Sequence, residues 1–314
     1  MNCYLSPNYK GLSSAGNKAK TDIEQIMKDL SFKNVGLKQT TYRNKVLSFL
    51  FTLAGVLKAP FCLHRGDYLV LQYPLKKYFT FVCNMAHQRG AKVIVIIHDL
   101  GSFRRKALTV KQEISRLNHA DYIIAHNVLG IFDYLSETSA APKQNTEKPY
   151  SVLYAGALSP RKNAFLYEVG AFVHSFSLNL YGNGFEINQA KGKEHFNYMG
   201  FVKSDDLIAT AQGDFGLVWD GTSVSTCTGD FGEYLQYNNP HKTSLYIRCQ
   251  LPVIIWKQAA LADFVRENGI GICVDSLEEL EKILNTLSEE EYAEMKKRTA
   301  KIGERLSQGL TGSY

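Results

Sequence analysis

The sequence predicts an α/β fold of two doubly wound domains, each a parallel sheet with helices on both faces. Short runs rich in Val, Ile, Leu and Tyr alternate with amphipathic stretches at helical spacing. These runs are apolar on both faces, as strands are when helices cover a parallel sheet on either side. A polar segment at 136–150, which contains two prolines, interrupts the alternation before it restarts. We therefore predict domains at 1–147 and 148–314, with 136–150 as the linker.

The first domain is predicted to begin with a strand at 2–7, followed by a loop rich in glycine and serine and by a helix at 19–32. Further β-branched runs predict strands at 67–74, 92–99 and 121–127. Amphipathic stretches between them predict helices at 75–90 and 109–120.

One stretch of the first domain, at 42–61, resembles a membrane segment. Its apolar core, Val46 to Leu57, is shorter than the roughly 20 residues that cross a bilayer. Arg43, Lys45 and Lys58 flank this core. We expect a buried helix that faces the domain core. The alternative is a basic-edged helix that rests on the cytoplasmic leaflet of a membrane.

The second domain repeats the alternation of strands and helices. Strands are predicted at 151–158, 177–184, 196–202, 215–221, 252–256 and 271–276. The last stretch, 288–309, is predicted to be a helix, and Ser288 with Glu291 provides a capping box at its start. We allow for this final helix packing back on the first domain.

The net charge and the spacing of the cysteines indicate which ligands and which cell compartment to expect. The formal net charge is +6, from 36 Lys and Arg against 30 Asp and Glu, which suits an anionic ligand or an acidic membrane surface. No dense basic stripe alternates with aromatic residues, so nucleic acid is not expected as a partner. The six cysteines lack any CxxC or paired His spacing, so we expect free, mostly buried thiols in a reducing cytosol. No signal peptide is recognisable at the N-terminus, and the expected location is cytoplasmic.

In open parallel sheets, ligands bind beyond the carboxyl ends of the strands, and the residues there are the candidates for function. Asn239 and Pro240 predict the cap and first position of a helix that leads into the strand at 252–256. The helix start therefore lies at the carboxyl edge, where its amides and dipole favour an anion. His241 and Lys242 oppose the dipole there, which indicates a bound phosphate; a solvated lysine is the alternative.

Two more strand ends of the second domain carry candidates. The strand at 151–158 contains Gly156 and leads into a helix start where Arg161 is placed to bind phosphate oxygens. Gly182 ends the next strand in a Gly-x-Gly pattern, which allows close backbone approach to a nucleotide or makes a turn. The long loop at 219–239 offers Asp220, Asp230 and Glu233. Glu233 lies nine positions before Lys242, so both could reach one ligand.

The first domain has a glycine loop at 11–20, in which Gly16 and Asn17 lie at a helix start that could contact a pyrophosphate. His98 and Asp99 end the buried strand at 92–99, where either could act as a base or orient a sugar hydroxyl; the alternative is a purely structural pair. The weaker candidates on the acceptor side are His126 and Asn127.

The combination resembles a GT-B glycosyltransferase, a fold of two Rossmann-like domains that face a cleft. The segment "DFGEYLQYNNPHKTSLYIRCQLPVIIWKQAALADFVRENGIG" with "SLEEL" is similar to bacterial β-1,6-galactofuranosyltransferases, and "SSAGNKAKTDIEQIM" and "VIIHDLGSFR" support the match. A related group, glucosyltransferases that extend GlcNAc on serine-rich adhesins, shares the "FGLVW" strand and the helix with Lys242. The resemblance covers nearly the whole chain.

This resemblance implies a UDP-sugar donor in the second domain, with galactofuranose favoured, and neither cofactor nor metal. Lys242 and Arg161 would hold the diphosphate, and Glu233 and His241 would lie beside the sugar or ribose. Asp99, with His98 as the alternative, would face the acceptor and act as base if the reaction inverts. The sequence departs from the pattern of two glutamates flanking seven residues, because His241 occupies the second position.

The sequence also leaves two other functions open. A glucosyltransferase acting on a GlcNAc-modified adhesin and a non-catalytic subunit that binds a sugar nucleotide are both compatible with the sequence. An NAD-type oxidoreductase is not, because no GxGxxG follows the first strand. The expected partners are a nucleotide-sugar donor and a glycan, glycolipid or glycoprotein acceptor, with a peripheral membrane contact and a homo-oligomer as further options.

Overall fold

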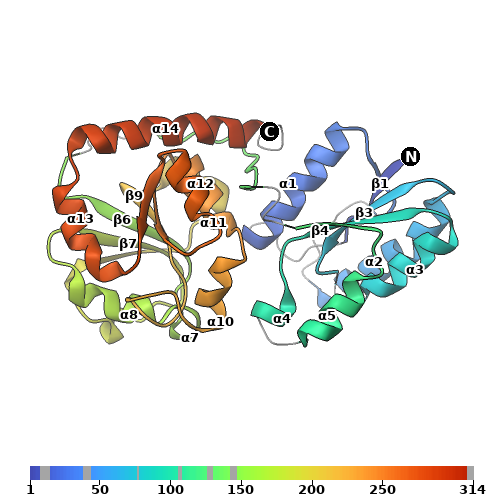
Figure 1. The fold of residues 1–314 in the computed structure, drawn as a ribbon, viewed down its shortest axis with the longest axis horizontal. Coiled ribbons are helices and arrows are strands. Elements are labelled where there is room, and N and C mark those ends of the chain that lie inside the picture. The colour runs from blue at the N-terminus through green and yellow to red at the C-terminus, as the bar shows by residue number, and fades with distance from the viewer. Residues whose placement is uncertain are drawn as a thin grey trace. The chain divides into compact units, whose positions relative to one another are not determined.

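The computed structural model describes residues 1–7, 15–37, 44–75, 78–104, 108–125, 130–141 and 147–309. These residues form two compact units, Met1–Leu129 and Gly130–Tyr314, and each has its own sheet and core (Figure 1). All strand pairs in the described residues are parallel. The predicted α/β class with two parallel sheets is therefore confirmed.

The first unit has a sheet in the order β2-β1-β3-β4-β5. Its described elements are β1 (Asn2–Tyr4), α1 (Ala15–Asp29), β2 (Lys33–Asn34), α2 (Lys45–Lys58), β3 (Tyr68–Tyr73), α3 (Phe79–Gln88), β4 (Lys92–Ile97), α4 (Gly101–Arg104), α5 (Val110–Leu117) and β5 (Tyr122–Ile124). The short edge strand β2 was not predicted, because two residues carry no readable alternation.

The second unit has a sheet in the order β11-β10-β9-β6-β7-β8. Its described elements are β6 (Ser151–Ala157), α7 (Pro160–Asn163), α8 (Phe165–Glu168), β7 (Ser177–Asn183), β8 (Phe196–Gly200), α9 (Ser204–Thr210), β9 (Phe215–Val218), α10 (Gly229–Gly232), α11 (His241–Arg248), β10 (Val253–Trp256), α12 (Ala262–Glu267), β11 (Gly271–Val274), α13 (Leu280–Thr286) and α14 (Glu289–Gln308). The capping box of Ser288 and Glu291 forms as predicted, and α14 packs against α11 within this unit (Figure 1).

The boundary between the units lies between Leu129 and Gly130, earlier than the predicted boundary at 147/148. The predicted linker is tied to the second unit by the buried Arg248, whose Nη2 donates to Ser136 O at 2.8 Å and to Thr138 O at 2.9 Å. Just before it, Tyr134 is fully buried in the core of that unit. A segment of polar composition is thus held in place because its backbone carbonyls accept from a buried guanidinium.

Helix α2 forms where a buried helix was predicted, but the burial of its faces is the reverse of the expectation. Ser48, Gly55 and Val56 face inward, whereas most of the large apolar side chains are exposed. The interpretation of a helix that buries its apolar side in the core is therefore wrong. Within the described ranges, no helix has both the length and the apolar character needed to cross a bilayer.

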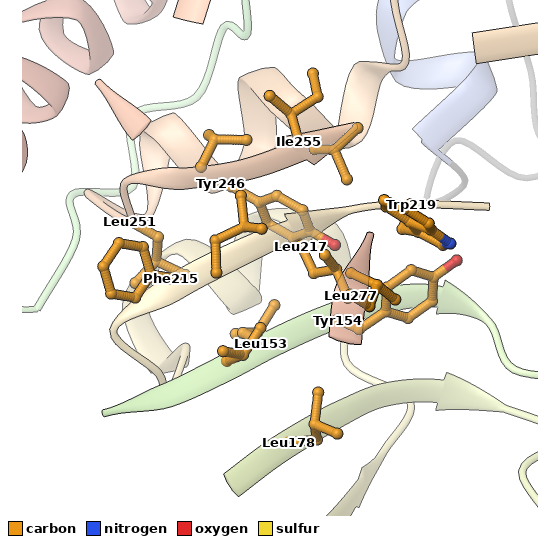
Figure 2. Close-up of a cluster of buried hydrophobic side chains, with 14 of the residues drawn as sticks. Leu153, Tyr154, Leu178, Phe215, Leu217, Trp219, Tyr246, Leu251, Ile255 and Leu277 are labelled. Atoms are coloured by element: carbon orange, nitrogen blue, oxygen red, sulfur yellow. The ribbon is translucent and has the colours of Figure 1, made fainter. Parts of the chain in front are cut away.

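The core of the second unit holds α11 rigidly against the sheet. Gly216 on β9 leaves room for the Tyr246 ring, since a Cβ there would lie 2.3 Å from Tyr246 Cγ. The Tyr246 hydroxyl accepts a hydrogen bond from Ala155 N on β6 at 2.8 Å. Figure 2 shows Tyr246 packed over these strands among buried side chains that include Tyr154 and Trp219. Lys242 lies four residues before Tyr246, on the same helix face, so this anchor determines where the lysine side chain emerges.

Candidate functional site

The structure gathers four polar side chains at the carboxyl edge of the second sheet. Lys242 Nζ, from the first turn of α11, donates to Asp220 Oδ1 at 2.8 Å and to Tyr154 Oη at 3.0 Å. The Tyr154 hydroxyl donates in turn to Asp220 Oδ1 at 2.8 Å. Lys162 Nζ, from α7, lies 3.6 Å from Asp220 Oδ2. We call these four residues the lysine cluster. The sequence predicted Lys242 at this edge; Lys162 and Tyr154 were missed, and Asp220 was noted only as one acid of a loop.

Burial makes the lysine cluster electrostatically strained. The side chains of Lys242 and Asp220 are only 12% and 10% exposed. Burial lowers the pKa of Lys242 to about 8, although the Asp220 charge opposes this shift. Burial alone would raise the pKa of Asp220, but the charges of Lys242 and Lys162 outweigh it and hold that pKa below its usual range. Two cations therefore face one carboxylate, and the cluster has a net positive charge.

The lysine cluster has capacity for a further anion. The ammonium of Lys242 has three N–H donors. Two of them are used by Asp220 and Tyr154, and no other described residue accepts from Nζ. The start of α11 also lacks a side-chain cap, so its first amides and the helix dipole favour a negative charge beside Lys242.

Asn239 and His241 serve the packing of the second unit. Pro240, not Asn239, precedes the first helical residue, and the predicted cap by Asn239 is absent. The amide of the buried Asn239 side chain instead donates to Gly130 O, which satisfies that donor within the second unit. The buried His241 ring stacks on Tyr134, with centroids 4.9 Å apart. The structure therefore does not bring these two residues into the lysine cluster, and their contact with a ligand remains a prediction.

The two candidate glycines lie opposite each other on neighbouring strands. Gly156 on β6 pairs with Gly182 on β7, and their φ angles are 151° and 149°. A Cβ on Gly182 would lie 1.9 Å from Gly156 O, so the close backbone approach at Gly182 is to the next strand. A Cβ on Gly156 would lie 3.9 Å from the Tyr154 hydroxyl, which places Gly156 beside the lysine cluster.

Arg161 and Glu233 are both exposed. Arg161 lies on α7 next to Lys162, but it is Lys162 that turns toward Asp220. Glu233 follows α10 at the start of a short 3-10 turn, Glu233–Gln236, and forms no hydrogen bond or ion pair with any residue that the structure describes. Lys162 Nζ lies 5.7 Å from the ring centroid of Phe231, so the loop that carries Glu233 adjoins the lysine cluster.

In the first unit, His98 is held by a hydrogen-bond chain at the carboxyl end of β4. The Gln72 amide nitrogen donates to Lys20 O at 3.0 Å and lies 3.3 Å from Glu24 Oε1, so the Gln72 oxygen is the acceptor toward His98. His98 Nε2 lies 2.7 Å from that oxygen and must carry the proton. In the neutral ring, Nδ1 is then the basic nitrogen.

Asp99 follows His98, and one of its two carboxylate oxygens accepts a hydrogen bond. Its Oδ2 accepts from Arg104 Nη1 at 2.8 Å. Its Oδ1 is enclosed and has no hydrogen-bond partner among the described residues. Burying a carboxylate oxygen without a donor costs free energy, and strain, catalysis or an ordered water or ion can each account for such an atom. The predicted role of Asp99 as a base stays a prediction.

Glu113, which the sequence analysis did not single out, anchors the segment after Asp99. This buried carboxylate accepts from Gly101 N at 2.9 Å, from the Ser102 hydroxyl at 2.5 Å and from the Tyr73 hydroxyl at 2.8 Å. Burial would raise the pKa of Glu113, but these donors, Ser102 first, outweigh it and lower that pKa. No local pattern marks such a residue, because its partners are distant in sequence.

The remaining candidates of the first domain lie at the start of α1 or outside the described residues. Gly16 lies in the first turn of α1, and Asn17 follows it with a partly exposed side chain. Most of the glycine loop before them lies outside the described residues, as do His126 and Asn127.

The cysteines are free, as predicted. Within the described residues, no three His, Cys, Asp or Glu side chains gather closely enough to hold a metal ion.

The chain matches known proteins along most of its length. Residues 2–129 match the family model described as Glucosyltransferase 3-like, N-terminal domain, and residues 152–311 match its C-terminal counterpart. The chain is 32% identical to the Beta-1,6-galactofuranosyltransferase WbbI of Escherichia coli strain K12, with coverage of 96% of this chain and 92% of that protein. It is 26% identical to Glucosyltransferase 3 of Streptococcus gordonii, with coverage of 93% and 90%.

One solved structure supports the fold assignment. The sucrose-phosphate synthase from Thermosynechococcus elongatus superposes with a TM-score of 0.55 at 13% identity, covering 98% of this chain and 94% of that one. At this identity the likeness concerns the fold alone. It confirms the predicted GT-B fold, whose two Rossmann-like domains correspond to the two parallel sheets.

Proposed function

The chain belongs to the glucosyltransferase 3-like family of glycosyltransferases, and on that premise we propose that it transfers galactofuranose from a UDP-sugar to a glycan acceptor. The choice of galactofuranose is supported by the relative at 32% identity, which is a β-1,6-galactofuranosyltransferase. The glucosyl donor is the alternative, supported by the relative at 26% identity.

The observation that carries the proposal is the lysine cluster at the start of α11. The leaving group of a UDP-sugar is a nucleoside diphosphate, and its negative charge grows as the glycosidic bond breaks. Cations and oriented amides stabilise that charge when they are in place beforehand. Lys242 and Lys162 supply the cations, and the uncapped α11 supplies the amides. We place the diphosphate there, with Arg161 as a further contact from α7.

The acceptor side of the reaction is proposed to use Asp99. An acceptor hydroxyl oxygen bonds to the anomeric carbon of the sugar, and the bond from that carbon to the UDP oxygen breaks. The hydroxyl proton moves to a base, and we propose Asp99 because Arg104 engages only its Oδ2 while Oδ1 has no partner among the described residues. His98 is the alternative base, through Nδ1.

A nucleotide-sugar panel tests the proposed function directly. UDP-galactofuranose and UDP are expected to raise the thermal midpoint by a few degrees at about 100 times Kd, whereas matched ADP and GDP compounds are not. Mass spectrometry of a glycan acceptor incubated with UDP-galactofuranose should show addition of one hexose. If no nucleotide sugar stabilises the protein, the proposal fails. Tight binding with neither transfer nor hydrolysis would favour a non-catalytic binding subunit instead.

Donor affinity is expected to fall as pH rises through about 8. Lys242 has its pKa lowered to about 8, so the free protein loses this charge above that pH. Tyr154 stays neutral, since burial and Asp220 raise its pKa well above the ordinary value. Calorimetric titration of UDP from about pH 7 to about pH 9.5 should show affinity falling by up to about tenfold per pH unit above the break. Constant affinity over that range would contradict a role for the Lys242 charge.

A further inference from the structure

Helix α2 presents an apolar face to solvent. Helix α2 is labelled in Figure 1. By helical spacing, Val46, Leu47, Leu50 and Leu57 lie on one side of it, and we call them the α2 face. Their exposed fractions range from 44% to 64%, and Phe61 in the following turn is 80% exposed. A surface helix of a globular domain normally directs such a stripe into the core. Here the arrangement is inverted.

The inward side of α2 is built for close packing. Ser48 is only 4% exposed, although a serine on a surface helix would ordinarily face water. Gly55 also faces inward, and a Cβ there would lie 3.3 Å from Leu37 N. Lys58 Nζ donates to Gly36 O at 3.1 Å, which joins the end of α2 to the segment after β2. These contacts hold the helix in an orientation that leaves the α2 face outward, so its exposure belongs to the fold.

The stretch of sequence that contains α2 has cationic residues but no acidic ones. Between Asp29 and Asp67 the sequence contains no Asp or Glu. The same stretch contains six cationic residues: Lys33, Lys38, Arg43, Lys45, Lys58 and Arg65. The formal net charge of the whole chain is also +6, so the positive charge of this stretch equals the excess of Lys and Arg over Asp and Glu in the whole chain. Among the described residues, Lys33, Lys58 and Arg65 are exposed.

We propose that the α2 face binds the surface of an anionic lipid bilayer, with the helix lying in the interface plane. An apolar stripe combined with cations and without acids is the chemistry of interfacial helices. A second copy of this chain is a poorer occupant, because pairing two α2 faces would bring two acid-free, cationic stretches together. A contiguous exposed apolar face of this kind is a liability in a monomer unless something covers it. This inference does not rest on the proposed function.

Vesicle sedimentation of the full chain tests the proposal. Binding is expected to vesicles of phosphatidylcholine with about a third phosphatidylglycerol, to be much weaker for phosphatidylcholine alone, and to weaken in high salt. The double variant Leu50→Gln, Leu57→Gln should partition at least about tenfold less. The double variant Lys33→Gln, Arg65→Gln should lose binding only to the anionic vesicles.

The chain offers a matched control for the apolar change. Val110 and Ile114 lie four residues apart on α5, in the same unit, and are 48% and 53% exposed. The double variant Val110→Gln, Ile114→Gln should bind vesicles as the parent does. The thermal midpoints of the Leu50, Leu57 variant and of the Val110, Ile114 variant should both match the parent, since all four of these side chains are exposed. Failure of the parent to bind anionic vesicles overturns the proposal. So does a Leu50, Leu57 variant that alters only the sedimentation coefficient, which would identify the α2 face as an interface between copies.

Discussion

Replacing Lys242 with alanine is expected to weaken UDP binding at least about tenfold and to lower kcat/KM for the UDP-sugar about a hundredfold. The change removes the ammonium that we place on the diphosphate. The larger effect on kcat/KM follows because the phosphate charge is greatest when the glycosidic bond is breaking. Calorimetry measures the UDP affinity, and steady-state kinetics measure kcat/KM.

Lys257 is the matched control for this substitution. Its Nζ lies 2.9 Å from Asp275 Oδ2, but both side chains are more than half exposed. Lys257→Ala therefore breaks the same kind of ion pair in the same unit without touching the lysine cluster. UDP affinity and kcat/KM should both stay at the parental values. If Lys242→Ala also keeps parental UDP affinity, the diphosphate does not bind where we place it.

A second variant separates ligand binding from stability. Lys242→Ala leaves Asp220 buried with only Lys162 beside it. This is expected to cost about 3 kcal/mol of unfolding free energy, the low end for a broken buried ion pair, because Lys162 still faces the carboxylate. The double variant Asp220→Asn, Lys242→Met removes both charges and keeps an acceptor for the Tyr154 hydroxyl. We expect it to recover most of the stability, as measured by urea unfolding, without recovering UDP affinity. Recovery of both would mean that Lys242 serves the fold alone.

Replacing Asp99 with asparagine is expected to lower kcat by a factor of about 100 to 10,000, which is the range for a lost general base. Donor affinity should change less than about twofold, because Asp99 belongs to the unit without the lysine cluster. Asparagine keeps the size of the side chain and an oxygen for Arg104. Single-turnover kinetics with saturating donor measure the loss.

Asp29→Asn is the control for the loss of a carboxylate in the same unit. Asp29 ends α1, and among the described residues its carboxylate accepts only an exposed hydrogen bond from Gln25, at 2.8 Å. This variant should turn over like the parent. Normal turnover in Asp99→Asn would remove Asp99 as the base and leave His98, whose Nδ1 is the basic nitrogen of the neutral ring.

Local sequence patterns were sufficient to predict the elements that position the site. The alternation of β-branched runs and amphipathic stretches predicted both parallel sheets, and the capping box of Ser288 and Glu291 predicted the start of α14. The place of Lys242 followed from topology, since a helix that leads into a parallel strand begins at the carboxyl edge. These predictions succeeded because each depends on spacing within one element or on the order of neighbouring elements.

The partners of Lys242 could not be predicted in this way. Tyr154 and Asp220 lie 88 and 22 residues before it, and nothing in those intervals indicates that the three side chains meet. The same holds for Asn239, whose local pattern indicates a helix cap but whose amide binds Gly130 O. A buried donor or acceptor takes whichever partner the packed chain brings to it.

The sequence by itself determined that this protein has two parallel α/β sheets and that a lysine lies at the carboxyl edge of the second. Only the tertiary structure decided which carboxylate that lysine meets, that the segment at 130–141 belongs to the second unit, and that α2 turns its apolar side outward. The physical reason is that periodicity records which side chains share a face of an element. The direction of that face depends on the small residues and backbone groups against which the element packs.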